Sequence, residues 1–352
     1  MQESLLQLFP RDRQPFWSHV FRSRESIREI RLRIDRPVLV QRAEGECFLD
    51  EQGNFTNDAG CAHRTGQREL EEILMHICHD SPYAFEDELR QGFITVPGGH
   101  RVGVAGQAVL EEDGKLRTIK YIHYINIRIA HQLFGVAEPL LPRVYQDGQL
   151  QNTLIVSPPG CGKTTLLREL VRRISDGNAY SRGLSVGVVD ERSELAGSYL
   201  GKPQNDLGSR TDVLDACPKI LGMMLLLRSM SPRVIAVDEL GDDRDVAALR
   251  AAAACGSRIL ATVHGTDIGD VADRFPKLGE AALFACVIVL GKQGGQPVVK
   301  QVYGGGEAAC AFSGWNHDRE RMPGLRPVVS GAVRGKTFGF AHSGVDFGNA
   351  HE

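Results

Sequence analysis

Two hydrophobic patterns divide the chain. From about residue 27 to 130, apolar residues alternate with polar ones in short runs, and "EIRLRI" (29–34) is typical of a half-buried strand. The segment "QRELEEILMHIC" (67–78) instead has its apolar residues at helical spacing. "RVGVAGQAVLEEDGKLRTI" (101–119) predicts a hairpin that turns at Asp113-Gly114, and "HYINIRIA" predicts one more strand. These elements together predict a mixed α+β domain.

Beyond residue 150 the pattern changes to short, uninterrupted apolar runs. "NTLIV" precedes a glycine-rich loop and a helix, and the later runs are "SVGVVD", "RVIAVD", "RILATVH" and "FACVIVLG". Helical stretches separate several of these runs, which is typical of a parallel sheet with crossover helices. The expected organisation is a smaller α+β N-terminal domain (1–130), a linker (131–150), an α/β P-loop domain (151–305) and a flexible tail (306–352).

Composition narrows the class of protein. The 352 residues are 42% hydrophobic and carry a formal net charge of −3, which gives no general attraction to nucleic acid or to anionic membranes. The eight cysteines form no CxxC pair, so neither a zinc ribbon nor a disulfide framework is indicated. The N-terminus shows no secretory signal, and no apolar run is long enough to cross a bilayer. A cytoplasmic protein is therefore expected.

The segment "SPPGCGKTT", which begins at Ser157, lies between a buried strand and an amphipathic helix, the context of a phosphate-binding loop. Serine replaces the usual first glycine, but it is small and compatible with a turn, so we expect a working site. Gly160 and Gly162 let backbone N–H groups face phosphate, while Lys163 is expected to reach the β- and γ-phosphates and Thr164 to ligate Mg²⁺. The expected nucleotide contacts are Pro159, Gly160, Cys161, Gly162, Lys163, Thr164 and Thr165.

Acidic residues follow two of the later strands. In "RVIAVDELG", Asp238 is expected near Mg²⁺ and Glu239 near the γ-phosphate, as a base or a water-positioning group. "VDERSEL" supplies weaker candidates for metal-water contacts, namely Asp190, Glu191 and Glu194. In "ILATVHG", His264 ends a strand at the same predicted edge and is a candidate sensor of the γ-phosphate, with a structural histidine as the alternative. For Cys161, a small filler is favoured over a reactive thiol.

The block "GSRTDVLDACPKILGMMLLLRSMSPRVIAVDELGDDRDVAALRAAAACGSRILATVHG" resembles the stage III sporulation protein AA family of endospore-forming bacteria. Further matching segments include "PPGCGKTTLLREL", "VVDERSELAG" and "SPYAFEDELRQGFITVPGGHRVGVAG", and together they span roughly residues 27–305. That family is similar to the hexameric ATPases of type II and type IV secretion and of pilus machines. The resemblance implies a RecA-like P-loop core that hydrolyses ATP with Mg²⁺.

The resemblance also implies partners and a role. A homo-oligomeric ring, with six subunits expected, would energise assembly of, or transport through, the channel that joins mother cell and forespore. The ring would work in the mother-cell cytoplasm and reach the membrane through the membrane protein subunits of that channel. An arginine from another domain or subunit is expected to stabilise the transition-state charge. Arg101 and Arg128 match the relevant strands best, and Arg210 and Arg228 are alternatives.

Two other functions stay open at this point. The arginine-rich opening "FRSRESIREIRLRIDR" allows a P-loop ATPase or regulator that depends on single-stranded DNA or RNA. Strand alternation explains Arg31 and Arg33 as an exposed face, and few aromatic residues are interleaved for base stacking, so nucleic acid is not the expected partner. The third possibility is a nucleotide-gated scaffold with negligible turnover.

Overall fold

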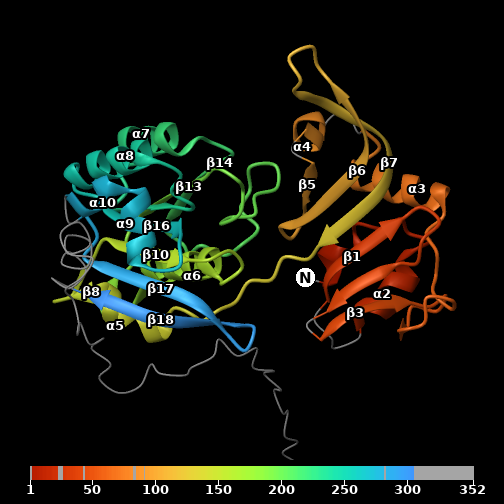
Figure 1. The fold of residues 1–352 in the computed structure, drawn as a ribbon, viewed down its shortest axis with the longest axis horizontal. Coiled ribbons are helices and arrows are strands. Elements are labelled where there is room, and N and C mark those ends of the chain that lie inside the picture. The colour runs from red at the N-terminus through yellow and green to blue at the C-terminus, as the bar shows by residue number, and fades with distance from the viewer. Residues whose placement is uncertain are drawn as a thin grey trace, which may run out of the picture. The chain divides into compact units, whose positions relative to one another are not determined.

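Two seven-stranded sheets organise the described residues of the computed structural model, one antiparallel and one mostly parallel (Figure 1). The described residues are 2–22, 27–42, 44–81, 85–90, 92–280 and 283–304, so the tail expected over 306–352 lies outside them. The chain divides into a first unit, residues 1–132 with 196–206, and a second unit, residues 133–195 with the chain from 207 onward.

The sheet of the first unit has the order β4-β3-β2-β1-β7-β6-β5, and all its neighbouring strands are antiparallel. Its strands are β1 (Ile27–Arg33), β2 (Leu39–Arg42), β3 (Gly45–Leu49), β4 (Phe55–Thr56), β5 (Phe93–Val96), β6 (His100–Leu110) and β7 (Leu116–Arg128). The alternation predicted around Ile30 and Leu32 is confirmed, since both side chains are buried in β1 while Arg31 is exposed. "HYINIRIA" is not a separate strand, because β7 continues through it from the hairpin.

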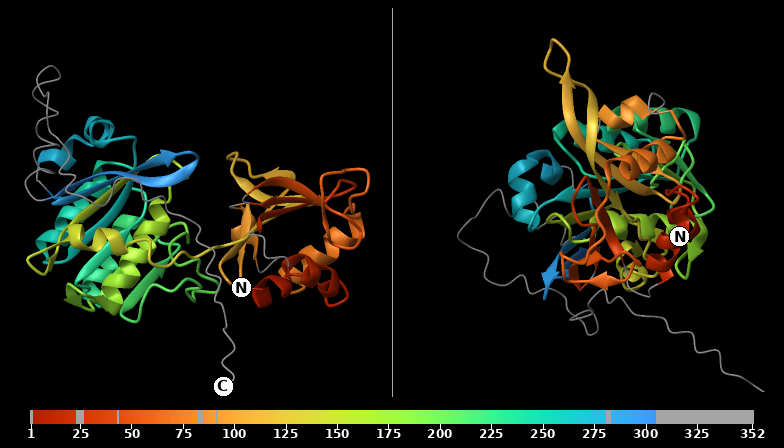
Figure 2. Two further views of the ribbon diagram at one scale, coloured as in Figure 1. Left: turned by 90° about the horizontal axis from the view of Figure 1, so that it is seen from below. Right: turned by 90° about the vertical axis from the view of Figure 1, so that its right-hand side faces the viewer.

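The β6–β7 hairpin extends beyond the other strands of its sheet (Figure 2). Its turn lies where the sequence predicted it: Gly114 has a φ of +81°, and the Lys115 N–H donates to Asp113 Oδ1 over 3.0 Å. From Ala105 to Leu110 nearly every residue of β6 is exposed. In β6, the apolar core therefore covers the first half of the strand, up to Val104, and leaves the second half exposed.

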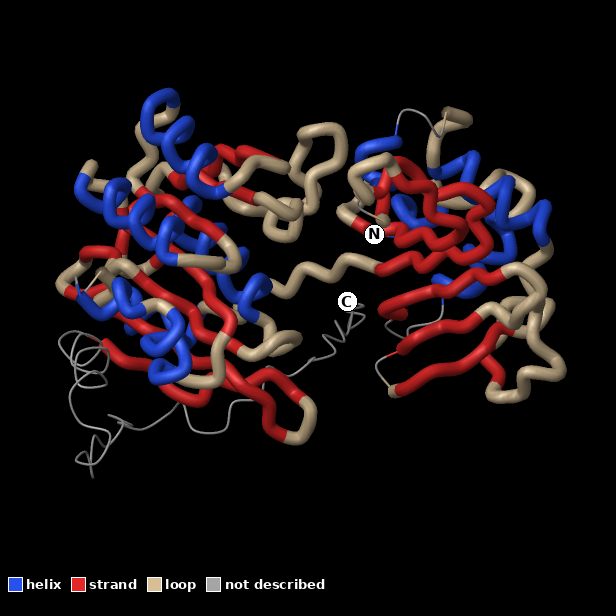
Figure 3. Tube along the Cα trace, turned by 45° about the horizontal axis from the view of Figure 1, so that its top comes forward, coloured by secondary structure: helices blue, strands red, loops and turns tan. Residues whose placement is uncertain are grey.

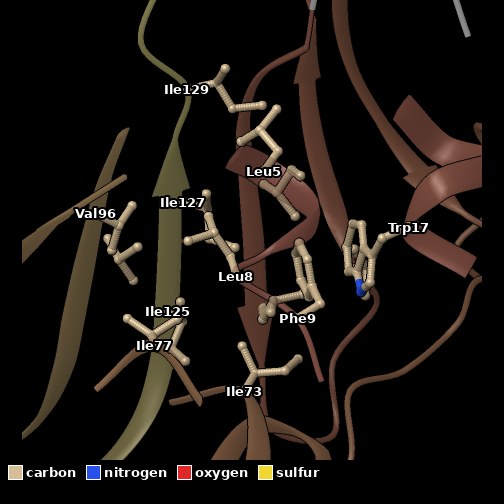
Figure 4. Close-up of a cluster of buried hydrophobic side chains, with 14 of the residues drawn as sticks. Leu5, Leu8, Phe9, Trp17, Ile73, Ile77, Val96, Ile125, Ile127 and Ile129 are labelled. Atoms are coloured by element: carbon tan, nitrogen blue, oxygen red, sulfur yellow. The ribbon is translucent and has the colours of Figure 1, made fainter. Parts of the chain in front are cut away.

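Helices cover one face of this sheet with apolar side chains. They are α1 (Gln2–Leu6), α2 (Gln14–Arg22), α3 (Gln67–Ile77) and α4 (Glu86–Arg90). Figure 4 shows side chains from α1 to α3 and the intervening segment, among them Phe9 and Trp17, facing strand residues such as Ile127. The Phe9 and Trp17 rings stack with centroids 4.2 Å apart. The helix predicted over 67–78 is confirmed as α3, with Leu70 among its buried residues.

The sheet of the second unit has the order β14-β13-β15-β16-β10-β17-β18, and its neighbours are parallel except for β17 and β18. Its strands are β10 (Thr153–Ser157), β13 (Val186–Asp190), β14 (Thr211–Asp215), β15 (Val234–Val237), β16 (Arg258–His264), β17 (Cys286–Gln293) and β18 (Gln296–Gly304). β10, β13 and β15 are buried along their whole length, which explains their uninterrupted apolar sequences. The predicted α/β fold with a parallel sheet is confirmed.

Helices pack on both faces of this sheet (Figure 3). The main ones are α6 (Lys163–Asp176), α7 (Lys219–Ser229), α8 (Asp243–Ala254), α9 (Ile268–Arg274) and α10 (Pro276–Glu280). Leu154 and Val156 of β10 join a cluster with α7, α8 and α9. Ile155 points the other way, since side chains alternate along a strand, and α6 packs on that face. The carboxyl ends of β10, β15 and β16 therefore meet at one edge, beside the start of α6.

Short elements occupy the remainder of the second unit. They are η2 (Glu138–Leu140), α5 (Leu141–Val144), β8 (Tyr145–Gln146), β9 (Gln149–Leu150), β11 (Gly177–Asn178) and β12 (Ser181–Arg182). Most of the expected linker, 131–150, thus contains regular structure, and from residue 133 it groups with the second unit. Among the described residues, no helix combines the length and apolar character that a membrane span requires.

Residues 196–206 follow β13 along the chain, but they group with the first unit. Within that unit, Tyr199 Oη lies 2.8 Å from His79 Nε2, and the Gly98 N–H donates to Gln204 Oε1 over 2.9 Å. Gln132 and Asp206 exchange hydrogen bonds of 2.7 and 2.9 Å. The chain consequently passes between the two units at residues 132/133, 195/196 and 206/207.

Candidate nucleotide-binding site

The loop between β10 and α6 has the backbone of a phosphate-binding loop. Gly160 and Gly162 have φ values of +68° and +86°, in the left-handed region where a side chain is strained, so both positions require glycine. Lys163 begins α6, whose first N–H groups are directed at the loop. Ser157 is different: it is the last residue of β10, pairs with His264 of β16 and is absent from the residues with positive φ. Serine is tolerated there because the backbone is extended.

The side chains of Lys163 and Glu239 meet beside this loop. Lys163 is only 8% exposed, and its Nζ lies 2.5 Å from Glu239 Oε1. His264 Nε2 lies 3.0 Å from the same oxygen, and Arg192 Nη1 donates to Glu239 Oε2 over 2.6 Å. Burial alone raises the pKa of the Glu239 carboxyl, but Lys163, Arg192 and His264 outweigh it, and the pKa lies below its ordinary value. Glu239 is therefore a carboxylate at neutral pH.

Asp238 lies between two hydroxyl groups. Thr164 Oγ1 donates to Asp238 Oδ2 over 2.7 Å, and Thr262 Oγ1 donates to Oδ1. The Thr262 oxygen also accepts the Glu239 N–H over 2.9 Å, and the Thr262 side chain is fully buried. Glu239 itself has a φ of +56°, an uncommon conformation for a residue other than glycine. Thr262 thus holds both the Asp238 carboxylate and the backbone of Glu239.

The oxygen atoms at this position fit a magnesium ion. Thr164 and Asp238 supply a hydroxyl and a carboxylate at adjacent positions, the ligand types that Mg²⁺ prefers, with substrate phosphates completing the shell. The described residues contain no group of three or more His, Cys, Asp or Glu side chains that could hold a metal by themselves. The donor set is thus suited to a metal that arrives with a nucleotide.

The second acidic segment lies at the same edge of the sheet. Its side chains line a small hollow of about 10 Å³, together with Asp238 and Glu239. Asp190 is 1% exposed and accepts the Glu194 N–H over 2.8 Å, while Glu191 pairs with Lys219. A hollow of this size holds about one water molecule, and the metal-water contacts expected of these carboxylates stay a prediction.

His264 and Cys161 differ in what their polar atoms contact. His264 Nδ1 is buried and has no hydrogen-bond partner among the described residues, so one ring nitrogen faces Glu239 and the other is left for another group. Cys161 is 3% exposed, and its thiol lies 3.8 Å from the Pro159 carbonyl oxygen. Burial of the thiol favours its interpretation as a filler of the loop. Thr165 is half-buried in the first turn of α6.

The arginines named from the sequence do not join this cluster within the second unit. Arg101 and Arg128 lie opposite each other on β6 and β7 of the first unit. The Arg101 guanidinium lies 4.7 Å from the Phe93 ring centroid, and Arg128 Nε lies 3.3 Å from Glu29 Oε1.

Of the two alternatives, Arg210 directly precedes β14 and Arg228 lies in the last turn of α7, so both belong to the end of the sheet where these parallel strands begin, opposite the loop. Arg192, which sequence reasoning did not single out, is the arginine that contacts Glu239. Its position inside "VDERSEL" was the only signal available from the sequence.

The strand order, the loop and the carboxylates at one sheet edge define a P-loop protein with a RecA-like core. The family described as "Sporulation stage III, protein AA" matches residues 3–308. The chain is 43% identical over 279 residues to Stage III sporulation protein AA of Bacillus subtilis (strain 168), covering 79% of this chain and 86% of that protein. The chain belongs to this family.

Solved structures share the fold at low sequence identity. The ATPase DotB of Legionella pneumophila has a TM-score of 0.52 at 17% identity, covering 80% of this chain and 76% of DotB. The pilus retraction motor PilT, solved with bound ADP, has a TM-score of 0.54 at 16% identity, covering 82% of this chain and 83% of PilT. These similarities concern the fold. The predicted resemblance to the sporulation family and to secretion and pilus ATPases is confirmed.

Proposed function

We propose that this chain is a Mg²⁺-dependent ATP hydrolase of sporulation. The observation that carries the proposal is the convergence of Lys163, Glu239 and Asp238 on one phosphate-binding loop. Lys163 is the natural partner of a terminal phosphate, and its transfer from Glu239 to that phosphate frees the carboxylate to orient a water molecule and accept its proton. Thr164 and Asp238 would hold Mg²⁺, which would supply positive charge to neutralise the phosphates.

Other side chains act on the same step. Thr262 holds the Asp238 carboxylate and the Glu239 backbone by hydrogen bonds, so both residues are positioned before substrate binds. His264 contacts Glu239 through one nitrogen and has the second nitrogen unpartnered among the described residues, an arrangement suited to reporting the presence of a γ-phosphate. The nucleotide contacts are Pro159, Gly160, Cys161, Gly162, Lys163, Thr164 and Thr165.

A motor role requires that several copies of this chain assemble. We infer a homo-oligomeric ring, with six subunits, in which Arg101 or Arg128 of one subunit completes the site of its neighbour. Family membership and the fold shared with the ATPase DotB and the motor PilT support a role in energising the channel between mother cell and forespore. The ring would act from the mother-cell cytoplasm and reach the membrane through the channel's membrane subunits.

Nucleotide binding and phosphate release by the full-length chain test the activity. Glu239→Gln should bind Mg²⁺-ATP as wild type does but lower turnover by about 100-fold or more, since a general base contributes that much. Lys163→Ala should weaken binding and block sporulation. Asp212→Asn removes an exposed carboxylate of β14 and serves as the matched control.

The outcomes separate the alternatives. Turnover by Glu239→Gln equal to wild type would exclude the proposed role of Glu239, and normal spore counts with Lys163→Ala would exclude an essential ATPase. ATP binding with negligible phosphate release by wild type would indicate a nucleotide-gated scaffold. Strong, salt-sensitive stimulation by single-stranded DNA or RNA would indicate the nucleic-acid-dependent function.

A further inference from the structure

The β17–β18 hairpin lies next to the phosphate loop. Strand β17 pairs with β10 from Cys286 to Val289 and then continues past the end of that pairing to Gln293. Gly294 and Gly295, with φ values of +56° and +79°, turn the chain into β18. The hairpin in Figure 2 is the blue pair of strands. Because β10 leads directly into the loop, the free end of the hairpin extends alongside it.

Two facing residues of the hairpin lie beside the loop glycines. Lys292 and Pro297 are directly opposite each other in the β17–β18 register. A Cβ atom placed on Gly160 would lie 3.5 Å from Lys292 Nζ, and a Cβ placed on Gly162 would lie 3.8 Å from Pro297 Cβ. Since the two contacts involve different residues and different glycines, they establish independently that this face of the hairpin is turned toward the loop.

The Lys292 ammonium group lies at the loop, and no residue that the structure describes pairs with it. Within the described part of the chain, no hydrogen bond or ion pair engages Lys292, and its side chain is exposed. Lys163 differs, because its ammonium is held by Glu239. Lys300 of β18 differs too, because its side-chain carbons lie over Gly291. Among these three lysines, Lys292 alone combines proximity to the loop with a charge that no described residue balances.

We propose that Lys292 is a second lysine that binds the nucleotide's phosphates, contributed by the hairpin of the same subunit. The proposal rests on the function proposed above, that the loop binds ATP. A flexible ammonium group beside Gly160 reaches the anion that the loop's N–H groups hold, and a charge-assisted contact strengthens binding. Because ADP and ATP share their first two phosphates, Lys292 should stabilise both complexes and contribute little to the chemical step.

Binding of Mg²⁺-ADP and Mg²⁺-ATP to the full-length chain tests the proposal by calorimetry. Lys292→Ala should weaken both nucleotides by about tenfold, the effect of losing one hydrogen bond to a charged group. Lys292→Arg should stay within about twofold of wild type. Lys300→Ala, which removes the same charge from the same hairpin, should also stay within about twofold. In phosphate release, Lys292→Ala should raise KM by about tenfold and leave kcat within about twofold.

The results that would overturn the proposal are distinct from failure of the ATPase itself. Wild-type affinity in Lys292→Ala, with binding lost in Lys163→Ala, would exclude phosphate binding by Lys292 and leave the proposed ATPase intact. An equal loss in Lys292→Ala and Lys300→Ala would show a general charge effect in place of a contact. No binding by natively folded wild type would exclude the ATPase and this inference together. Matching thermal unfolding of all the variants excludes misfolding as the cause.

Discussion

The ammonium nitrogen of Lys163 lies 2.5 Å from Oε1 of Glu239, so the charge of the first residue of α6 is balanced by a carboxylate that follows β15. Arg192 and His264 add positive charge around the same carboxylate. A phosphate that competes for Lys163 therefore changes the charge balance at Glu239 directly. In the proposed mechanism, Lys163 leaves Glu239 when it binds the phosphate. Substrate binding and activation of the carboxylate therefore occur together.

Arg192 should control the ionisation of Glu239. Replacing it in Arg192→Ala removes a cation that lowers the pKa of the Glu239 carboxyl, so that pKa rises. A base must be deprotonated to act, and the acid limb of the kcat profile should therefore move to higher pH. Phosphate release measured from about pH 3.5 to 8, a range that spans the ordinary pKa of a glutamate carboxyl, checks this. Arg192→Lys keeps the charge and should keep the wild-type profile; an unmoved limb in Arg192→Ala would contradict the prediction.

Thr262 should contribute to stability and to activity through one hydroxyl group. In Thr262→Val, Asp238 Oδ1 and the Glu239 N–H lose their shared partner inside a buried site. Leaving a buried polar group unpaired costs about 1–3 kcal/mol, which urea unfolding followed by circular dichroism would measure. Turnover should fall as well, because the Asp238 carboxylate and the Glu239 backbone lose the hydrogen bonds that position them. Thr262→Ser retains the hydroxyl and should recover most of both losses; equal losses in the two variants would indicate packing alone.

The arginines of the first unit should act between subunits. Arg101→Ala and Arg128→Ala should keep ATP binding, and at least one should lose turnover. Mixing that inactive variant with Glu239→Gln before assembly restores some complete sites, because each protein supplies what the other lacks. With random 1:1 mixing, about a quarter of the interfaces carry both groups.

Phosphate release by the mixture, with mass measurement in solution, is the readout for this experiment. Activity near a quarter of wild type supports action in trans. A mixture as inactive as its components would place the arginine in its own subunit's site or in none. Mixing of tagged and untagged wild-type chains controls for subunit exchange.

His100 should make the first unit less stable in mild acid. It is 1% exposed, its Nδ1 accepts the Ala130 N–H over 3.0 Å, and its Nε2 lies 3.2 Å from Ser4 Oγ. Burial lowers its pKa from 6.5 to about 4. Below pH 6.5 His100 binds a proton in the unfolded chain, whereas in the folded unit it stays neutral until about pH 4. The unfolding free energy therefore falls over this interval, by up to about 3 kcal/mol.

The comparison of wild type with His100→Asn isolates this contribution. Asparagine offers an acceptor but does not titrate, so the variant should be less stable at pH 7 yet lose less stability on acidification. Urea unfolding can be followed through Trp17, one of two tryptophans, in a Trp315→Phe background. Equal acid slopes in both proteins would show that His100 does not titrate as described.

Sequence patterns predicted the parts of the fold in which local preference and burial agree. The phosphate loop, Asp238 and Glu239 could be located because each follows a strand that is buried throughout, and such strands have unbroken apolar sequences. The helix α3 was recognisable from its spacing. The strand β14 was not, because only half-buried and exposed residues form it, and its partner β13 specifies it.

The contacts that sequence reasoning missed join residues that are far apart along the chain. Arg192 reaches Glu239 across 47 positions, and Lys292 lies beside Gly160 because β17 is the neighbour of β10 in the sheet. Neither contact follows from local spacing. The long β7 was predicted as two elements, because its alternation is interrupted between Lys120 and Tyr124, where the register with β6 shifts and Tyr121 has a φ of +47°.

The extended backbone of Ser157 bears on how related sites are recognised in other sequences. A search string that demands glycine at the first position would discard this chain, although no feature of the backbone there excludes a side chain. Glycine is obligatory at 160 and 162, where φ is positive. A query that requires those two glycines, followed by lysine and a hydroxyl residue, and accepts any small residue at the first position would retrieve such chains.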